Sequence, residues 1–150
     1  MSRSLREAKG LDIPLSTGPI RVNSDEHYVL TLCERIIGRR SLREYAFDWL
    51  RADPDARGNR RKLPVDAYWP EHSVAAQYYA GPIIPDLATA SDRTLQRVAY
   101  DHRRRTELAR YRIELVEISS EQLAHRGTKL LRDADHDLSV LRPLVEAALP

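Results

Sequence analysis

Asp66, Gln77 and Tyr79 are the residues whose types and spacing could act on a phosphodiester. Two stretches with the composition of β-strands carry them, residues 63–69 and 73–79. Side chains two apart on a strand share a face, so Gln77 and Tyr79 are expected to point together. An adjacent strand in suitable register would bring Asp66 to them. Phosphodiester hydrolysis needs a hard cation that polarises the phosphate and generates hydroxide, and Mg²⁺ prefers oxygen ligands such as these.

The pair at positions 77 and 79 is a weak version of such a site. The amide oxygen of Gln77 can ligate Mg²⁺ but supplies no negative charge, and the hydroxyl of Tyr79 can only donate a hydrogen bond or orient water. Two interpretations of Asp66 stay open, a metal ligand or a strand-end carboxylate bonded to a turn amide. Gln77 has the alternative of a solvated or network glutamine, and Tyr79 that of sheet packing.

The elements that would position these residues follow from periodicity and from start and stop signals. An apolar stripe at helical spacing follows the capping residues Asn23 and Ser24 and ends at Gly38. The sequence predicts helices at about 24–37, 92–110 and 135–149, strands at 45–50, 63–69, 73–79 and 113–118, a surface loop at 81–91 and a helical turn from Ser119.

The fold class expected from this order is α/β. Three strands with short connections form an antiparallel meander, and the long helix before the fourth strand permits a crossover. The result is an α/β/α sandwich with a mixed sheet, in the order helix, three-strand meander, helix, strand, helix. One domain is expected at 23–150, preceded by a flexible arm at 1–22 that is rich in Gly and Pro and has no sustained period.

This order resembles the common core of the PD-(D/E)XK, or restriction-endonuclease-like, nucleases, and within it the small bacterial branch related to very-short-patch-repair endonucleases. Three segments carry the resemblance. Residues 63–70, with Val65, Asp66 and Pro70, resemble that branch's V-D-x-x-x-P strand. Residues 74–81 stand where relatives have a V-x-E-x-(D/H/K)-G segment, and residues 100–118 resemble a D-x-x-R helix running into the fourth strand.

The resemblance implies a site and a substrate. In the family pattern the Glu position is held here by Gln77 and the Lys position by Tyr79, while Glu26 matches an acidic residue of the first helix, with Glu34 as its backup. The implied catalytic residues are Asp66, Gln77, Tyr79 and Glu26; the implied Mg²⁺ ligands are Asp66, Glu26 and Gln77; the implied phosphate contacts to DNA are Arg97, Arg103 and Arg104. A solvated helix face, with Arg97, Asp101 and Arg105 paired at i,i+4 spacing, is the simpler account of these arginines.

Composition excludes several other classes. The chain has 150 residues, 42% of them hydrophobic and 31% charged, which suits one domain with a core. No apolar run could span a bilayer, and the first residues lack the apolar stretch of a secretory signal, so we expect no membrane association and a cytoplasmic location. Cys33 is the single cysteine and lies on the apolar stripe of the first helix, so we expect a buried thiol.

Three hypotheses about function stay open. The first is a Mg²⁺-dependent DNA endonuclease with a degenerate active site. The second is a catalytically inactive protein of the same fold that binds DNA or a protein partner. The third is a structural interaction protein without a nucleic-acid role, which the modest net charge of +2 keeps open.

Overall fold

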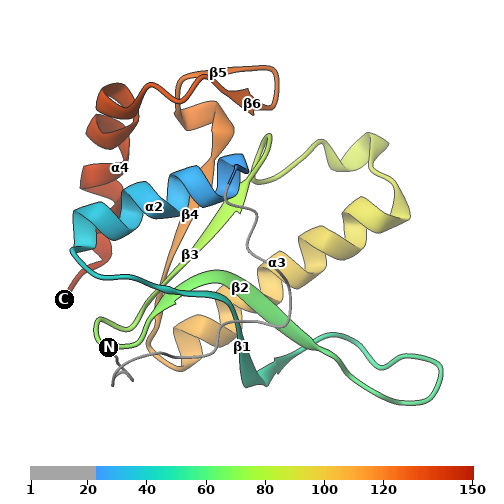
Figure 1. Ribbon diagram of the computed structural model, residues 1–150. Helices are drawn as coiled ribbons and strands as arrows, with labels where there is room; N and C mark the ends of the chain where they lie inside the picture. Colours follow the sequence, from blue (N-terminus) through green and yellow to red (C-terminus); the bar gives the residue numbers. More distant parts are fainter. Residues whose placement is uncertain (1–22) are drawn as a thin grey trace.

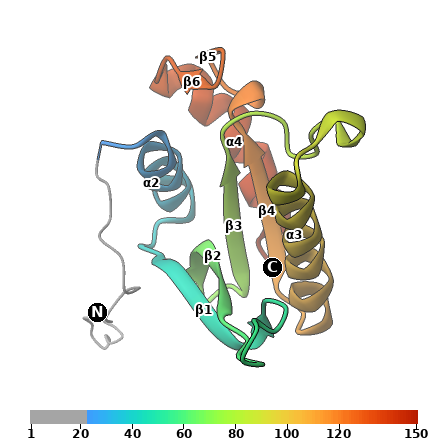
Figure 2. The same cartoon turned by 90° about the vertical axis from the view of Figure 1, so that its right-hand side faces the viewer.

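A four-stranded mixed sheet forms the middle of the molecule, with helices on both of its faces (Figures 1 and 2). The structure is a computed structural model that describes residues 23–150; the arm predicted at 1–22 lies outside the described residues. The main elements in chain order are α2 (Asp25–Ile37), β1 (Leu42–Arg51), β2 (Lys62–Trp69), β3 (Val74–Tyr79), α3 (Asp92–Arg110), β4 (Glu114–Ser119) and α4 (Ala134–Ala148). Shorter pieces are η1 (Leu87–Thr89), η2 (Ser120–Gln122), β5 (His125–Arg126) and β6 (Lys129–Leu130).

The strand order is β1-β2-β3-β4, which confirms the expected α/β class with a mixed sheet. The β1–β2 and β2–β3 pairs are antiparallel, as the short connections predict, while β3 and β4 are parallel. A parallel pair needs a long connection, and α3 supplies it. α3 lies on one face of the sheet (Figure 2), and Gln77 and Tyr79 lie near the C-terminal end of β3.

The helix ends follow their capping signals. Ser24 precedes α2 and its side chain accepts a hydrogen bond from the His27 N–H, while Gly38 ends the helix with a φ of 80°. Ser91 caps α3 in the same way through the Thr94 N–H. The predicted limits of these two helices are therefore confirmed to within a residue or two.

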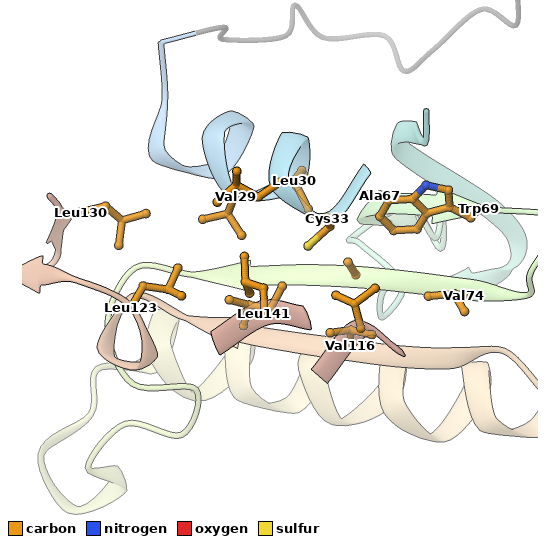
Figure 3. Close-up of a cluster of buried hydrophobic side chains, with 14 residues drawn as sticks. Val29, Leu30, Cys33, Ala67, Trp69, Val74, Val116, Leu123, Leu130 and Leu141 are labelled. Atoms are coloured by element: carbon orange, nitrogen blue, oxygen red, sulfur yellow. The ribbon is translucent and has the colours of Figure 1, made fainter. Parts of the chain in front are cut away.

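Two hydrophobic clusters lie on opposite faces of the sheet. The larger joins α2 and α4 to the sheet and includes Cys33, fully buried as predicted, and Trp69 (Figure 3). The smaller packs the α3 face through residues such as Leu63, Val65 and Leu108. Helices on both faces explain why the central strand β3 is buried on both sides.

Two features differ from the sequence-based expectation. β1 begins at Leu42 rather than residue 45, because Leu42 and Arg43 already pair with Tyr68 and Ala67 of β2. The β5–β6 hairpin was not predicted. Its strands are two residues long, and Asp25 of α2 accepts a hydrogen bond from the Leu130 N–H to hold it in place. Between residues 23 and 150, no helix has the length and apolar character to cross a bilayer.

Candidate active site

The site is built at a fork where β2 and β3 separate. Their backbone pairing runs through Ala67 and Ala76, and the next residues on the two strands are Asp66 and Gln77. Here side chains replace the ladder: the Asp66 N–H donates to Gln77 Oε1 at 3.1 Å, and the Tyr78 N–H donates to Asp66 Oδ2 at 2.8 Å. The predicted meeting of Asp66 with Gln77 therefore occurs, through side chain to backbone bonds.

The fork coincides with a change of face along β2. Leu63 and Val65 pack in the cluster under α3, whereas Ala67 and Trp69 pack in the cluster under α2 and α4. Strict alternation would keep all four on one face, so β2 twists between Val65 and Ala67. Asp66 occupies this twist, which places its carboxylate at the boundary between the two layers.

Glu26 and Glu44 bring two more carboxylates into the electrostatic surroundings of Asp66. Burial raises the pKa of Asp66 to about 7, and the charges of Glu26 and Glu44 add to the rise, while the Tyr78 N–H and Arg104 oppose it. The pKa of Glu26 is also raised, by burial and then by Glu44, against the lowering effect of Arg43. Buried acids that raise one another's pKa values form a region where a cation would be stabilised.

The donor set fits a hard cation only in part. Among the residues the structure describes, no group of three or more His, Cys, Asp or Glu side chains is arranged to hold a metal ion. Asp66 and Glu26 would be the carboxylate ligands, and Gln77 would have to add its amide oxygen. That oxygen already accepts one hydrogen bond but keeps a second lone pair. Magnesium commonly completes its shell with water around one or two carboxylates, so Asp66 and Glu26 would hold the ion only together with several water ligands.

Tyr79 is turned toward β4. Its side chain is 6% exposed, and its hydroxyl donates to Glu117 Oε2 at 2.7 Å. Burial and this hydrogen bond raise the pKa of Tyr79 well above its ordinary value, so the phenol stays protonated. Arg105 Nε donates to the other oxygen of Glu117 at 2.8 Å. The expected role for Tyr79, orienting water or phosphate, would therefore compete with its bond to Glu117.

Glu117 was missed by the sequence analysis, and Arg105 was assigned to the wrong partner. Arg105 was expected to pair with Asp101 along the helix, but it forms its ion pair with Glu117 of β4. The parallel register puts Glu117 beside Gln77. The available signal was Glu117 itself, an acidic residue within the strand predicted at 113–118. Assigning Tyr79 and Arg105 as its partners requires knowledge of the β3–β4 register.

A cleft of about 570 Å³ opens beside the fork, between the end of β3, the loop after it and the part of α3 from Thr94 to Arg104. It is lined by Gln77, Tyr78, Tyr79, Ala80, Pro82, Pro85, Thr94, Arg97, Asp101 and Arg104. Its charged groups are two guanidinium groups and one carboxylate, which leaves a positive balance suited to an anion.

Two of the three arginines expected to contact phosphate line this cleft. Arg97 Nη1 lies 3.4 Å from Asp101 Oδ2 and its guanidinium is 5.7 Å from the centre of the Tyr79 ring. Arg104 binds Asp101 at 3.0 Å and donates from Nε to the Pro64 carbonyl. Arg97 is the more exposed of the two, so it is better placed to meet a ligand.

Arg103 and Glu34 lie elsewhere. Arg103 does not line the cleft: it donates to the Arg51 carbonyl at 2.8 Å and pairs with Asp53 at 2.7 Å, near the end of β1. Glu34, the alternative to Glu26, accepts hydrogen bonds from Ser41 and Arg43 and so joins α2 to β1.

Comparison with family models, with curated proteins and with solved structures gave no match to this chain. A functional assignment therefore has to be argued from the chemistry of the site.

Proposed function

We propose that this protein is a nucleic-acid-processing domain of the restriction-endonuclease-like kind, a Mg²⁺-dependent DNA phosphodiesterase with an altered metal site. The observation that carries the proposal is the fork of β2 and β3. There Asp66 and Gln77 meet within the electrostatic reach of Glu26, and Gln77 also lines a cleft that contains Arg97 and Arg104.

The residues divide into two functions. Asp66 and Glu26 would hold the ion with the amide oxygen of Gln77, and a bound Mg²⁺ would supply phosphate polarisation and a more acidic water. Arg97 and Arg104 would bind phosphate oxygens with the planar, multiply donating group that suits them. Asp101 keeps both guanidinium groups in the cleft before a ligand arrives.

The test is nicking of supercoiled plasmid in Mg²⁺ or Mn²⁺ by the wild-type protein and by Asp66→Asn. The asparagine keeps an acceptor for the Tyr78 N–H and removes only the charge. Glu71→Gln is the matched control, because Glu71 is a half-exposed acid just after the same strand, paired with Arg39 at 3.7 Å. Nicking lost in Asp66→Asn and kept in the control supports the proposal. Nicking that survives Asp66→Asn contradicts it.

A second candidate is an inactive protein of the same kind that binds DNA or a protein partner. It is favoured by one observation: the two altered positions already have partners within the protein, since Gln77 Oε1 accepts from the Asp66 backbone and Tyr79 donates to Glu117. A DNA-binding form would bind without cleavage, with an affinity that falls steeply as salt rises.

A further inference from the structure

Five aromatic rings form a continuous row on the α3 face of the sheet. The row consists of Tyr68, Tyr45, Phe47, Trp49 and Tyr111. Three come from alternate positions of β1, whose side chains share a face there. Ring contacts link each member to the next, with centroid separations between 3.9 and 5.1 Å. We call these five residues the aromatic row.

The row changes in geometry and exposure toward Tyr111. Its inner rings meet edge to face or at a tilt, as in a core, but Phe47 and Trp49 stack at 28°, and Trp49 and Tyr111 at 17° with centroids 3.9 Å apart. Phe47 is 8% exposed, while Tyr111 is 48% exposed. A near-parallel stack therefore ends in a ring that is half open to solvent.

The end of α3 fixes the last ring. Tyr111 caps the helix, and its N–H donates to the carbonyls of Glu107 and Leu108. The next residue, Arg112, has a φ of 61° and donates to the Ala109 carbonyl, which ends the helix. A ring held by a capped helix on one side and by Trp49 on the other is ordered before any ligand binds, which lowers the entropic cost of stacking on it.

Exposed arginines precede and follow Tyr111 in the sequence. Arg110 is largely exposed and 3.8 Å from Glu107, and Arg112 makes no ion pair within residues 23–150. Tyr111 thus combines a half-exposed ring with an exposed arginine on either side in the sequence. A nucleobase with its neighbouring phosphates offers a flat face for such a ring and negative charge for such arginines, whereas a purely apolar partner offers nothing to the charges.

We infer that Tyr111, backed by Trp49, is a stacking site for an unpaired nucleobase whose adjacent phosphates are bound by Arg110 and Arg112. The inference rests on the proposed action on nucleic acid and specifies the substrate as one with single-stranded character, because the faces of a paired base are already stacked within the duplex. The site lies on the same face of the sheet as the cleft, and the helical rise between Arg97 and Tyr111 separates them by roughly 20 Å. A strand of a few nucleotides spans that distance.

The test compares two oligonucleotides of equal length, a thymidine strand and an abasic strand with the same number of phosphates. Binding is measured by anisotropy with a chelator present, so that no cleavage occurs. Tyr111→Ala should weaken binding of the thymidine strand by roughly 5- to 100-fold, the loss of one stacked base. Tyr111→Phe, which keeps the ring, should stay within about twofold of wild type, and the abasic strand should not distinguish the three proteins.

Tryptophan fluorescence gives a second readout. The protein has two tryptophans, and Trp69 is only 1% exposed with its Nε1 bonded to the Arg39 carbonyl. A thymidine strand stacked on Tyr111 should change the emission of Trp49. Trp49→Phe should remove the change while keeping most of the affinity.

The outcomes separate this site from the proposed catalysis. Equal binding of the thymidine strand by wild type and Tyr111→Ala overturns the stacking site, even where Asp66-dependent nicking persists. Tyr111-dependent binding without any nicking supports the stacking site and removes the catalytic proposal. Failure of wild type to bind either strand at low salt also overturns the stacking site, and plasmid nicking then decides the catalytic proposal separately. A shift of oligomeric state in Tyr111→Ala, with unchanged affinity, would show that the ring contacts a second copy and would also overturn the inference.

Discussion

Asp66 combines a structural and an electrostatic role in one side chain. Its Oδ2 accepts the Tyr78 N–H where the β2–β3 ladder stops, so the carboxylate closes a gap in the sheet. The same position is buried and close to Glu26, which makes its ionisation costly. An aspartate with a purely structural role needs only the hydrogen bond to the backbone, not the raised pKa. Raised pKa values of buried carboxyl groups cluster at functional sites, where the group is held ready for a cation or a proton.

Asp66 should make the metal-free protein less stable as the pH rises. Its pKa is raised in the fold to about 7 from an ordinary value near 4. Between these two values the native carboxyl holds a proton that the unfolded chain releases, so the free energy of unfolding falls with increasing pH. Asp66→Asn should therefore melt higher than wild type at about pH 8, by on the order of 5 °C, and the difference should shrink toward pH 4.

Melting curves in a chelating buffer across this range test the prediction. A constant difference between the two proteins would show that Asp66 has an ordinary pKa. Added Mg²⁺ should raise the melting temperature of wild type at about pH 8 more than that of Asp66→Asn, because bound cation stabilises the ionised form.

Under the proposed function, introducing charged side chains at Gln77 and Tyr79 should produce or increase nicking activity. Gln77→Glu keeps an oxygen for the Asp66 N–H and adds a negative charge beside Asp66. Tyr79→Lys puts an ammonium group where the Tyr79 hydroxyl now meets Glu117. The double variant should nick plasmid at least tenfold faster than wild type in Mg²⁺, and Asp66→Asn in that background should abolish the gain. A folded double variant with no gain would contradict the proposed catalytic role of this site.

At the scale of elements, periodicity and capping signals were enough to predict the helices α2, α3 and α4 and the four strands of the main sheet, but not the short η1 inside the predicted loop at 81–91. They failed for β5–β6, because its strands are too short for a period and are held by distant side chains, Asp25 of α2 and Asp137 of α4. The switch of the inward-facing side chains of β2 from one side of the sheet to the other at Asp66 was also unpredictable, since it breaks the alternation on which strand patterns depend. Asp66 and Gln77 were paired correctly from their order, whereas the Tyr79–Glu117 contact depends on register.

Asp137 should be a strong stabilising contact between α2, α4 and the hairpin. It is fully buried, accepts from the Tyr28 hydroxyl at 2.6 Å, and accepts from the Ala124 N–H at 3.0 Å. Asp137→Ala should lower the free energy of unfolding by about 2–4 kcal/mol, because it leaves two partly buried donors without an acceptor. Tyr28→Phe removes one donor only and should cost about 1 kcal/mol. Urea unfolding measures both, and equal costs would contradict this ordering.

At the scale of the whole molecule, both hydrophobic clusters depend on one sheet. Ala76 of β3 packs in the larger cluster and its neighbour Ala75 in the smaller one, so the two faces of a single strand belong to different cores. Loss of either helix layer would expose the opposite side of the same strands. The two layers are therefore expected to unfold together.

Leu141→Ala and Leu108→Ala test whether the two helix layers unfold together, because the two leucines lie on opposite faces of the sheet. Each leucine is fully buried, Leu141 in the larger cluster and Leu108 in the smaller. Each substitution should cost about 2–5 kcal/mol. In both variants, urea transitions followed by circular dichroism and by tryptophan fluorescence should coincide. Separate transitions in Leu108→Ala would show that the α3 layer melts independently.

The left-handed backbone at Glu44 affects whether another protein chain can add a strand to the β1 edge of the sheet. β1 stands at the border of the sheet, a location where exposed amides and carbonyls can recruit another chain into a growing fibril. A φ of 47° at Glu44 interrupts the even spacing of those groups within the first few residues of β1. An incoming strand would lose register at this point, so the left-handed residue in β1 disfavours the addition of a further strand to this edge of the sheet.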